Sequence, residues 1–277
     1  KVGKLLGGGL VGIAPFDERW LYTHGLQFIP GKKPPLKVVP MENALPFKPK
    51  SIIMVVVEMN YEVAKLNPGY LGNASPNQGY SRMAVVAPSL AKFIQHLGYR
   101  AIPFGNDTVR NVPMAIAAGL GEGSRMGMLV TEKFGPRVRL CGVATEMELP
   151  FDKPVTFGVT EFCKVCMKCA DNCPSSAITK EREPSMDGQH NRSNSVGIKK
   201  WHVNAEKCLT YWGKLGCGCM NCIACCPYNK LDTWNHDMAK MLTVVPVARN
   251  MVRSLDESFG YGKVFDEKAM KAFWKKG

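Results

Sequence analysis

The chain has 277 residues, of which 45% are hydrophobic and 21% charged, and its formal net charge is +13 at pH 7. This length can bury one large core and a smaller one, and no apolar run approaches the roughly 18–20 residues that span a bilayer. The Lys and Arg residues are scattered, without a basic helix or an aromatic-interleaved stripe, so we expect no nucleic-acid partner.

The first half of the chain predicts a loop-rich start followed by strands and a helix. Residues 1–49 mix apolar stretches with Gly and Pro and form a first segment. Ile52–Met59 predicts a buried strand, because it is short, continuous and β-branched. Apolar residues at helical spacing predict a helix over Met83–Leu97, and Pro88 predicts that this helix is kinked or begins there.

The next segments continue the alternation of strands and helices. Further strands are predicted at Tyr99–Phe104, Met126–Thr131 and Val138–Ala144. A short helix is predicted from Asn111 to Ala118, because Pro113 suits its first turn. Alternating strands and helices predict a layered α/β or α+β domain over residues 50–157. A cysteine-rich segment over 158–230 follows, and residues 231–277 predict a C-terminal extension with one or two amphipathic helices.

Eight of the eleven cysteines lie in two short bursts, Cys163–Cys173 and Cys219–Cys226. The first burst has the spacing Cys-x2-Cys-x2-Cys-x3-Cys-Pro, which is typical of [4Fe–4S] ligands, and its fourth thiolate commonly serves the other cluster of a pair. Zinc ribbons need neither the third cysteine nor the final Cys-Pro, and disulfide scaffolds of this density are typical of much shorter chains. The bursts therefore predict a ferredoxin domain with two clusters.

The two cysteines that precede a proline are predicted to cross over between the clusters. The ligand sets are Cys163, Cys166, Cys169 and Cys226 for the first cluster, and Cys173, Cys208, Cys219 and Cys222 for the second. Cys208 is assigned because it completes a set of four thiolates. Cys217 and Cys225 remain alternatives for Cys208 or Cys226, and otherwise they are small buried apolar residues beside a cluster.

Several other motifs occur in a defined order around the bursts. They are Gly12–Ala14, Arg19–Tyr22, Gly79–Ser81, Leu97–Tyr99, Asn106–Asp107, Ala118–Glu122, Phe134–Leu140 and Trp201–Cys208. Together with the cysteine bursts, this order resembles the corrinoid- and iron–sulfur-dependent reductive dehalogenases of organohalide respiration. The resemblance implies an α/β (α+β) fold, with a nitroreductase-like corrinoid-binding core over 50–157 and a bacterial-type two-cluster ferredoxin domain over 158–230. Residues 1–49 would then cover the substrate pocket.

The resemblance also implies the residues of an active site. Tyr80 is the expected proton donor, assisted by Asn106 and Arg139, because a nearby Arg favours the phenolate and eases loss of the proton. The residues expected to contact a base-off, cobalamin-type corrinoid are Gly119, Leu120, Gly121, Glu122, Ser124 and Arg125. No Asp-x-His-x-x-Gly motif for a histidine ligand to cobalt occurs in the sequence.

The reaction implied by the resemblance is reductive removal of halogen from an organohalide such as a chlorinated ethene. Electrons would pass through the two clusters to a Co(I) corrinoid, and Tyr80 would supply the proton. The implied partners are a low-potential electron donor and a small integral-membrane anchor protein. The implied location is the outer face of the cytoplasmic membrane after twin-arginine export, and we expect that this chain lacks the signal and a leading unit.

Two other functions stay open on the sequence. Epoxyqueuosine reductase, a tRNA-modifying enzyme, has a similar core, but its proton donor is an Asp and its family carries further C-terminal helical repeats. The short segment after Pro227 disfavours it. A plain ferredoxin-type electron carrier, fused to a structural α/β domain, would contain the same cysteines and bind no cobalt.

Overall fold

The computed structural model describes the chain except residues 29–30, 34–35, 41–44, 188–193, 195–196, 232, 263–270, 273–274 and 276–277. It divides into two compact units, each built from three segments of the chain. Unit 1 comprises Lys1–Val57, Tyr80–Leu120 and Arg139–Pro154, and unit 2 comprises Glu58–Gly79, Gly121–Val138 and Val155–Gly277. The predicted domain limits followed the order of motifs along the chain, whereas the two units interleave.

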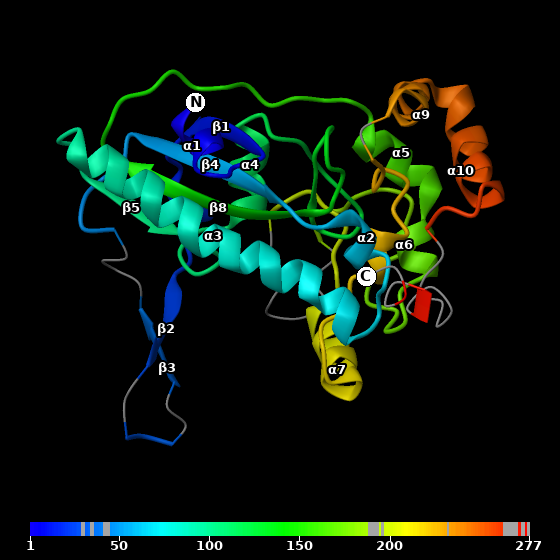
Figure 1. Ribbon diagram of the computed structural model, residues 1–277, viewed down its shortest axis with the longest axis horizontal. Coiled ribbons are helices and arrows are strands. Elements are labelled where there is room, and N and C mark those ends of the chain that lie inside the picture. The colour runs from blue at the N-terminus through cyan, green and yellow to red at the C-terminus, as the bar shows by residue number, and fades with distance from the viewer. Residues whose placement is uncertain are drawn as a thin grey trace. The chain divides into compact units, whose positions relative to one another are not determined.

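A four-stranded sheet with the order β1-β4-β8-β5 forms the centre of unit 1 (Figure 1). Its strands are β1 (Leu10–Pro15), β4 (Ser51–Glu58), β5 (Ala101–Phe104) and β8 (Val138–Thr145). β1 pairs antiparallel with β4, and β5 pairs antiparallel with β8. The first seven residues of β4 are all buried, which confirms the buried strand predicted from a continuous apolar run.

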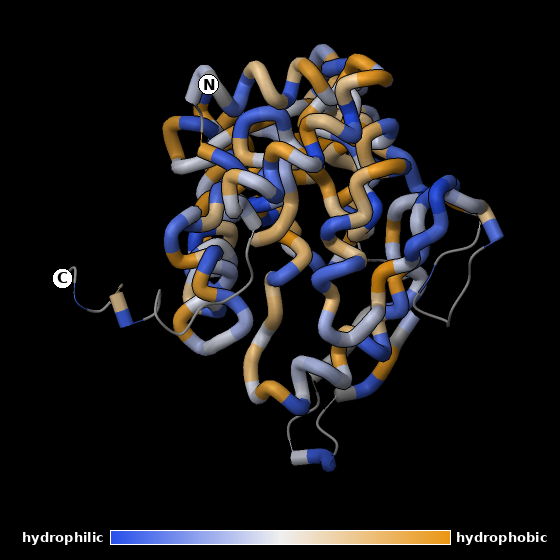
Figure 2. Tube along the Cα trace, turned by 90° about the vertical axis from the view of Figure 1, so that its right-hand side faces the viewer, coloured by the Kyte–Doolittle hydropathy of each residue, from blue (hydrophilic) through white to orange (hydrophobic). Residues whose placement is uncertain are grey.

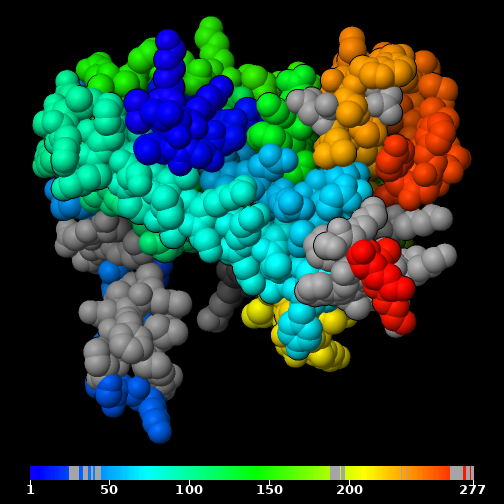
Figure 3. All heavy atoms as spheres, viewed as in Figure 1, coloured from blue at the N-terminus to red at the C-terminus, as the bar shows by residue number. Residues whose placement is uncertain are grey.

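The helix α3 (Tyr70–His96) packs on this sheet through the face that the helical spacing predicted. Its residues Met83, Val86 and Leu90 share one hydrophobic core with Val55 and Val143 of the strands. The opposite side of α3 is exposed along the surface seen in Figure 3.

Of the two alternatives predicted at Pro88, a kink or a helix start, the start was wrong, because α3 continues through Pro88 from Tyr70. A proline inside a helix leaves the carbonyl four residues earlier without its hydrogen bond. Pro88 and Ala84 are both exposed, so water can bind the freed carbonyl of Ala84.

The remaining elements of unit 1 lie around the sheet. The helix α4 (Asn111–Ala117) confirms the predicted short helix and contacts β1. This contact requires glycine at position 12, because a Cβ there would lie 2.1 Å from the carbonyl oxygen of Ala118. The other elements are α1 (Val2–Leu5), η1 (Glu18–Trp20), and the antiparallel hairpin of β2 (His24–Phe28) and β3 (Leu36–Pro40), which extends away from the sheet in Figure 1.

Unit 2 consists mainly of short helices joined by loops. They are α2 (Tyr61–Ala64), α5 (Val159–Cys166), α6 (Lys168–Asp171), α7 (Ala205–Leu215), α8 (Asn221–Ala224), α9 (Trp234–Val244), η2 (Pro246–Ala248) and α10 (Arg249–Ser258). α9 and α10 confirm the helical C-terminal extension, and most of the tail after Gly262 lies outside the described residues. In the described ranges no helix is long and apolar enough to cross a membrane, and hydrophilic residues are interspersed along the helices in Figure 2.

The strand predicted over Met126–Thr131 is shorter than expected. Only Leu129–Val130 is a strand, β7, and it pairs with β6 (Glu122–Gly123) in a two-stranded sheet. Gly127 adopts φ +72°, and its N–H donates to the carbonyl of Ser124 at 3.0 Å. The residues before Leu129 therefore form the turn of a tight hairpin.

We expect Gly→Ala substitutions at two positions of unit 2 to change the free energy of unfolding in opposite directions. A Cβ on Gly135, at φ +57°, would lie 2.1 Å from the carbonyl oxygen of Tyr228, so Gly135→Ala should lower the free energy of unfolding by about 1–3 kcal/mol. Gly213 is exposed within α7 with no atom near its Cβ, so Gly213→Ala should raise it by about 0.5–1 kcal/mol. Denaturant titrations followed by circular dichroism measure both values. Equal effects would contradict the close contact at Gly135.

Candidate functional site

The three residues predicted as a proton-donor site come together in unit 1. Tyr80 lies on α3, Asn106 follows β5, and Arg139 lies on β8. The Nδ2 atom of Asn106 donates a hydrogen bond to the Tyr80 hydroxyl at 3.2 Å. The guanidinium carbon of Arg139 lies 4.3 Å from the centre of the Tyr80 ring. An amide and a cation therefore both contact one phenol, although the sequence separates them widely.

A fourth residue, Asn111, holds this group in place and was missed by the sequence reasoning. Its Nδ2 atom donates to the side-chain oxygen of Asn106 at 2.9 Å and to the carbonyl of Gly105 at 2.7 Å. Because the oxygen of Asn106 accepts this bond, its NH₂ group is directed toward Tyr80. The sequence showed Asn111 only as the start of a predicted helix, which carries no sign of this contact.

The charge of Arg139 is held in a partly desolvated position next to Tyr80. Burial lowers the pKa of Arg139, and the nearby Tyr80 acts in the opposite direction. Its Nε atom is buried and has no hydrogen-bond partner among the residues that the structure describes. The positive charge of Arg139 thus lies against the face of the Tyr80 ring.

An open cavity of about 320 Å³ lies beside this group. Tyr80 and Asn106 line it together with the apolar side chains of Met83, Ala87 and Phe104. Tyr80 is 43% exposed, so its hydroxyl can be reached from outside unit 1. The cavity thus has a hydroxyl and an amide on a largely apolar wall.

Two glycines of the segment expected to contact a corrinoid are required by close contacts within the protein itself. Gly119 adopts φ +69°, and a Cβ there would lie 2.5 Å from the carbonyl oxygen of Lys153. A Cβ on Gly121 would lie 2.2 Å from the carbonyl oxygen of Val130. Leu120 between them is buried. Close approach of the protein's own backbone explains both glycines.

The polar side chains of that segment bind groups within unit 2. The Glu122 carboxylate accepts hydrogen bonds from the backbone N–H groups of Phe157 at 2.5 Å and Val159 at 3.2 Å, at the start of α5. Ser124 donates to the carbonyl of Met128 at 2.7 Å. Arg125 is completely buried and donates to backbone carbonyls. Each of these three side chains already has partners within unit 2. Corrinoid binding by Glu122, Ser124 and Arg125 stays a prediction.

The structure brings the cysteines of the first predicted ligand set together. Cys163 and Cys166 lie on α5, Cys169 lies on α6, and Cys226 follows α8. Burial raises the pKa of Cys169, and the nearby thiols of Cys163 and Cys226 raise it further. The pKa of Cys226 is likewise raised by burial and by Cys163 and Cys166. The four cysteines thus lie near one another, and Cys225 lies near Cys169 and Cys226 as well.

The second predicted set is also assembled in unit 2. Burial raises the pKa of Cys222, and the thiols of Cys225, Cys219, Cys173 and Cys208 raise it further. Cys208 and Cys173 act in the same way on Cys219. No three His, Cys, Asp or Glu side chains converge on a single metal position within the described ranges. A [4Fe–4S] cluster does not need this, since its four thiolates surround a cube and bind different irons.

The two alternative cysteines lie in different environments. Cys225 is completely buried, and its Sγ atom donates to the carbonyls of Lys168 at 3.6 Å and Cys222 at 3.7 Å. Burial raises its pKa to about 12. Cys217 is partly exposed and affects the pKa of Cys219. The structure thus gives Cys225 protein partners, while Cys217 lies beside the second set.

Comparison with known proteins agrees with this geometry. Residues 162–229 match a family described as a 4Fe-4S double cluster binding domain. The tetrachloroethene reductive dehalogenase of Desulfitobacterium hafniense is 43% identical over 94% of this chain and 53% of its own length. The chain is a relative of the reductive dehalogenases. The tetrachloroethene reductive dehalogenase of Sulfurospirillum multivorans is 36% identical over 94% of this chain and 55% of its own length.

The fold is shared with a solved reductive dehalogenase. The structure of the catabolic reductive dehalogenase NpRdhA has a TM-score of 0.80 and 25% sequence identity, and the match covers 95% of this chain and 36% of that chain. The predicted α/β fold with a ferredoxin-type domain is therefore confirmed. This chain spans about half the length of the curated reductive dehalogenases that it matches.

Proposed function

We propose that this chain is the part of a reductive dehalogenase that carries the proton donor and the electron-transfer clusters, and that its substrate is a chlorinated ethene. The observation that carries the proposal is Tyr80 beside an open cavity, with its hydroxyl bound by Asn106 and its ring covered by Arg139. Relatives named for tetrachloroethene suggest the substrate class.

The reaction replaces a halogen with hydrogen and consumes two electrons and one proton. The carbon–halogen bond breaks, halide leaves, and a carbon–hydrogen bond forms. The two cysteine sets would hold [4Fe–4S] clusters, which supply one-electron transfer. A corrinoid, when bound, would supply the reducing metal centre. B12-dependent dehalogenation is the mechanism suggested for a solved reductive dehalogenase of the same fold, which supports this part of the proposal.

The residues of unit 1 handle the proton. Tyr80 donates its hydroxyl proton to the carbon that loses the halogen. The phenolate that remains is stabilised by the charge of Arg139 and by the N–H group of Asn106. Asn111 keeps Asn106 oriented, so the donor group is set before substrate arrives.

The partners and the location belong to the same proposal. A low-potential donor would supply the electrons, and a small membrane protein would anchor the enzyme at the outer face of the cytoplasmic membrane. Both follow from the resemblance of the sequence to the family.

A single assay tests the proposed reaction. The chain is reconstituted anaerobically with iron, sulfide and cobalamin, and chloride release from chlorinated ethenes is measured with a low-potential donor. We expect chloride release that depends on each addition, and no conversion of epoxyqueuosine-containing tRNA. Protein that takes up iron but no cobalt would be a simple electron carrier. Protein loaded with both metals that releases no chloride would contradict the proposal.

A further inference from the structure

A completely buried arginine contacts a predicted cluster ligand. Arg125 is 0% exposed, and its Nε and Nη2 atoms donate to the carbonyl oxygen of Cys163 at 3.1 and 2.7 Å. Its Nη1 atom donates to the carbonyls of Thr179 at 2.8 Å and Glu181 at 2.6 Å. Its guanidinium carbon lies 5.0 Å from the ring centre of the buried Trp201. The donors are satisfied, but each of these acceptors is neutral.

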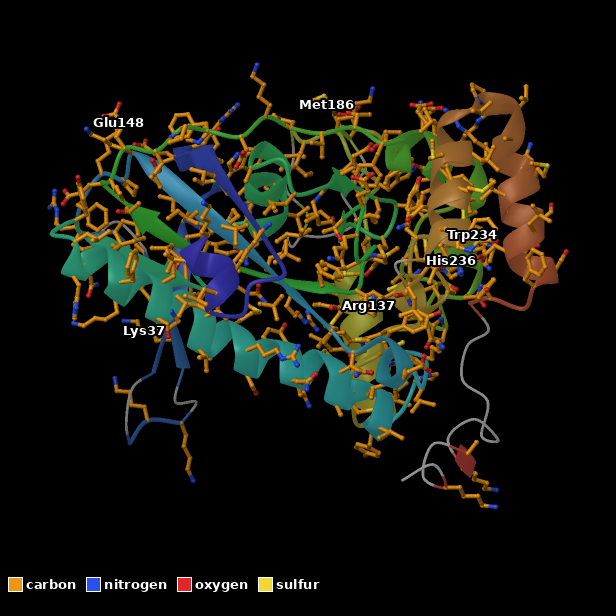
Figure 4. The ribbon with its side chains drawn as sticks, turned by 45° about the horizontal axis from the view of Figure 1, so that its top comes forward. Lys37, Arg137, Glu148, Met186, Trp234 and His236 are labelled. Atoms are coloured by element: carbon orange, nitrogen blue, oxygen red, sulfur yellow. The ribbon has the colours of Figure 1, made fainter. Side chains whose placement is uncertain are left out.

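The charge of Arg125 is therefore not paired directly with a carboxylate among the described residues. Arg125 forms no salt bridge with any Asp or Glu in the described part of the chain. Arg137, which is also buried in unit 2 and is labelled in Figure 4, donates to the Glu58 carboxylate at 2.6 Å. Because an unpaired buried charge is strongly destabilising, a fold that keeps Arg125 in this position needs an anion nearby.

A second excess positive charge lies next to another cysteine of the same set. Lys168 and Lys230 are both buried and share the single carboxylate of Asp256. Lys168 directly precedes Cys169, and its carbonyl accepts the Cys225 thiol. Two lysines and one aspartate leave one net positive charge inside unit 2. The buried Glu122 carboxylate also lies close by, at the start of α5. Around the first ligand set, the three buried cations Arg125, Lys168 and Lys230 thus outnumber the two buried carboxylates of Glu122 and Asp256.

A [4Fe–4S] cluster with four thiolate ligands is an anion that becomes more negative on reduction, and nearby charge helps to set its potential. We propose that the cluster held by Cys163, Cys166, Cys169 and Cys226 is the counter-ion of Arg125, and that Arg125 raises the reduction potential of this cluster. The inference rests on cluster binding as set out under the proposed function. It adds a residue from outside the matched range 162–229.

The position of Arg125 suits such a role. Its guanidinium binds the backbone carbonyl of Cys163 and not the sulfur, which stays available to bind iron. Burial beneath Trp201 excludes water, which strengthens the interaction between charges. None of the contacts of Arg125 reaches a ligand of the second set.

Three variants separate charge from shape. Arg125→Gln removes the charge and keeps an amide that can donate to the Cys163 carbonyl. Arg125→Lys keeps the charge with a different donor geometry. Arg100→Gln is the control, because it removes one positive charge from an exposed salt bridge of unit 1. The reconstituted proteins are titrated potentiometrically under anaerobic conditions, and the two clusters are followed by electron paramagnetic resonance.

We expect one of the two transitions to shift in Arg125→Gln, with reduction at least tenfold less favourable, which corresponds to about 59 mV for a one-electron couple. The other transition, and both transitions in Arg100→Gln, should stay in place. Arg125→Lys should retain most of the wild-type potential. If Arg125→Gln fails to take up iron while Arg125→Lys loads fully, the positive charge is again what the cluster needs.

Two results would overturn the inference. One is an Arg125→Gln protein with full iron content and unchanged potentials. The other is failure of both variants to load iron, because the guanidinium shape rather than its charge would then be required. The wild-type iron and sulfide content is measured in parallel. Wild-type protein that binds no cluster would instead contradict the proposed function.

Discussion

Replacing Tyr80 by Phe is expected to lower kcat for halide release by about 10²–10⁴-fold, the usual contribution of a positioned proton donor. The substitution removes the hydroxyl that accepts the hydrogen bond of Asn106 and leaves the ring beneath Arg139. Because Tyr80 contacts no cysteine in the structure, iron content and the spectra of the clusters should not change. Chloride release under saturating substrate, normalised to bound metal, measures the effect.

Tyr99→Phe provides the matched control for this experiment. Tyr99 lies in the same unit and is exposed to a similar extent, 41% against 43% for Tyr80. Its hydroxyl is no part of the Tyr80 group, so the rate of the Tyr99 variant should equal that of the wild type. A Tyr80→Phe enzyme that works at the wild-type rate would remove Tyr80 from the mechanism.

The second large effect is expected at Cys226, the cysteine assigned to cross over to the first set. Cys226→Ala should lose about half of the bound iron and one of the two cluster signals, because each cluster needs four thiolates. Cys225→Ala is the neighbouring control. The thiol of Cys225 donates to two backbone carbonyls, so its removal should leave both clusters in place. Iron analysis and electron paramagnetic resonance of the two reconstituted variants give the answer.

The reverse result would reassign the ligands. If Cys225→Ala loses the iron and Cys226→Ala retains it, Cys225 is the ligand and Cys226 the buried neighbour. The same pair of measurements on Cys208→Ala and Cys217→Ala decides the remaining alternative in the second set.

Local patterns in the sequence predicted the elements that depend on local physics. The run of apolar β-branched residues at Ile52–Val57 lies in a strand covered on both faces, and the helical spacing after Met83 matches the buried face of α3. The start of α3 could not be predicted from Pro88, because the cost of a proline depends on whether the freed carbonyl meets water or protein. Only the fold decides that.

In the candidate site, too, some features follow from local sequence and others only from the fold. The cysteine spacing is a local signal, and the resemblance to the family supplied Tyr80, Asn106 and Arg139, which the structure places in contact. Asn111 is positioned by the carbonyl of Leu140, and Arg125 by that of Cys163, both of which lie far along the chain. A single sequence contains no record of such pairs. Arg125 was expected to contact a corrinoid, which stays a prediction, and its burial against Cys163 and Trp201 could not be foreseen from the sequence.

The interleaving of the two units bears on how the iron–sulfur part can be handled as a module. Its predicted cluster ligands all lie within residues 158–230, so this segment alone suggests a domain that could be transferred to another protein. Three side chains that unit 2 needs, however, come from the strip Gly121–Val138: Glu122 caps α5, Arg125 binds the Cys163 carbonyl, and Arg137 pairs with Glu58. A fragment of residues 158–230 would leave the N–H groups at the start of α5 without Glu122 and would lack both Arg125 and Arg137. Transplantation into another scaffold therefore requires the strip as well as the cysteines.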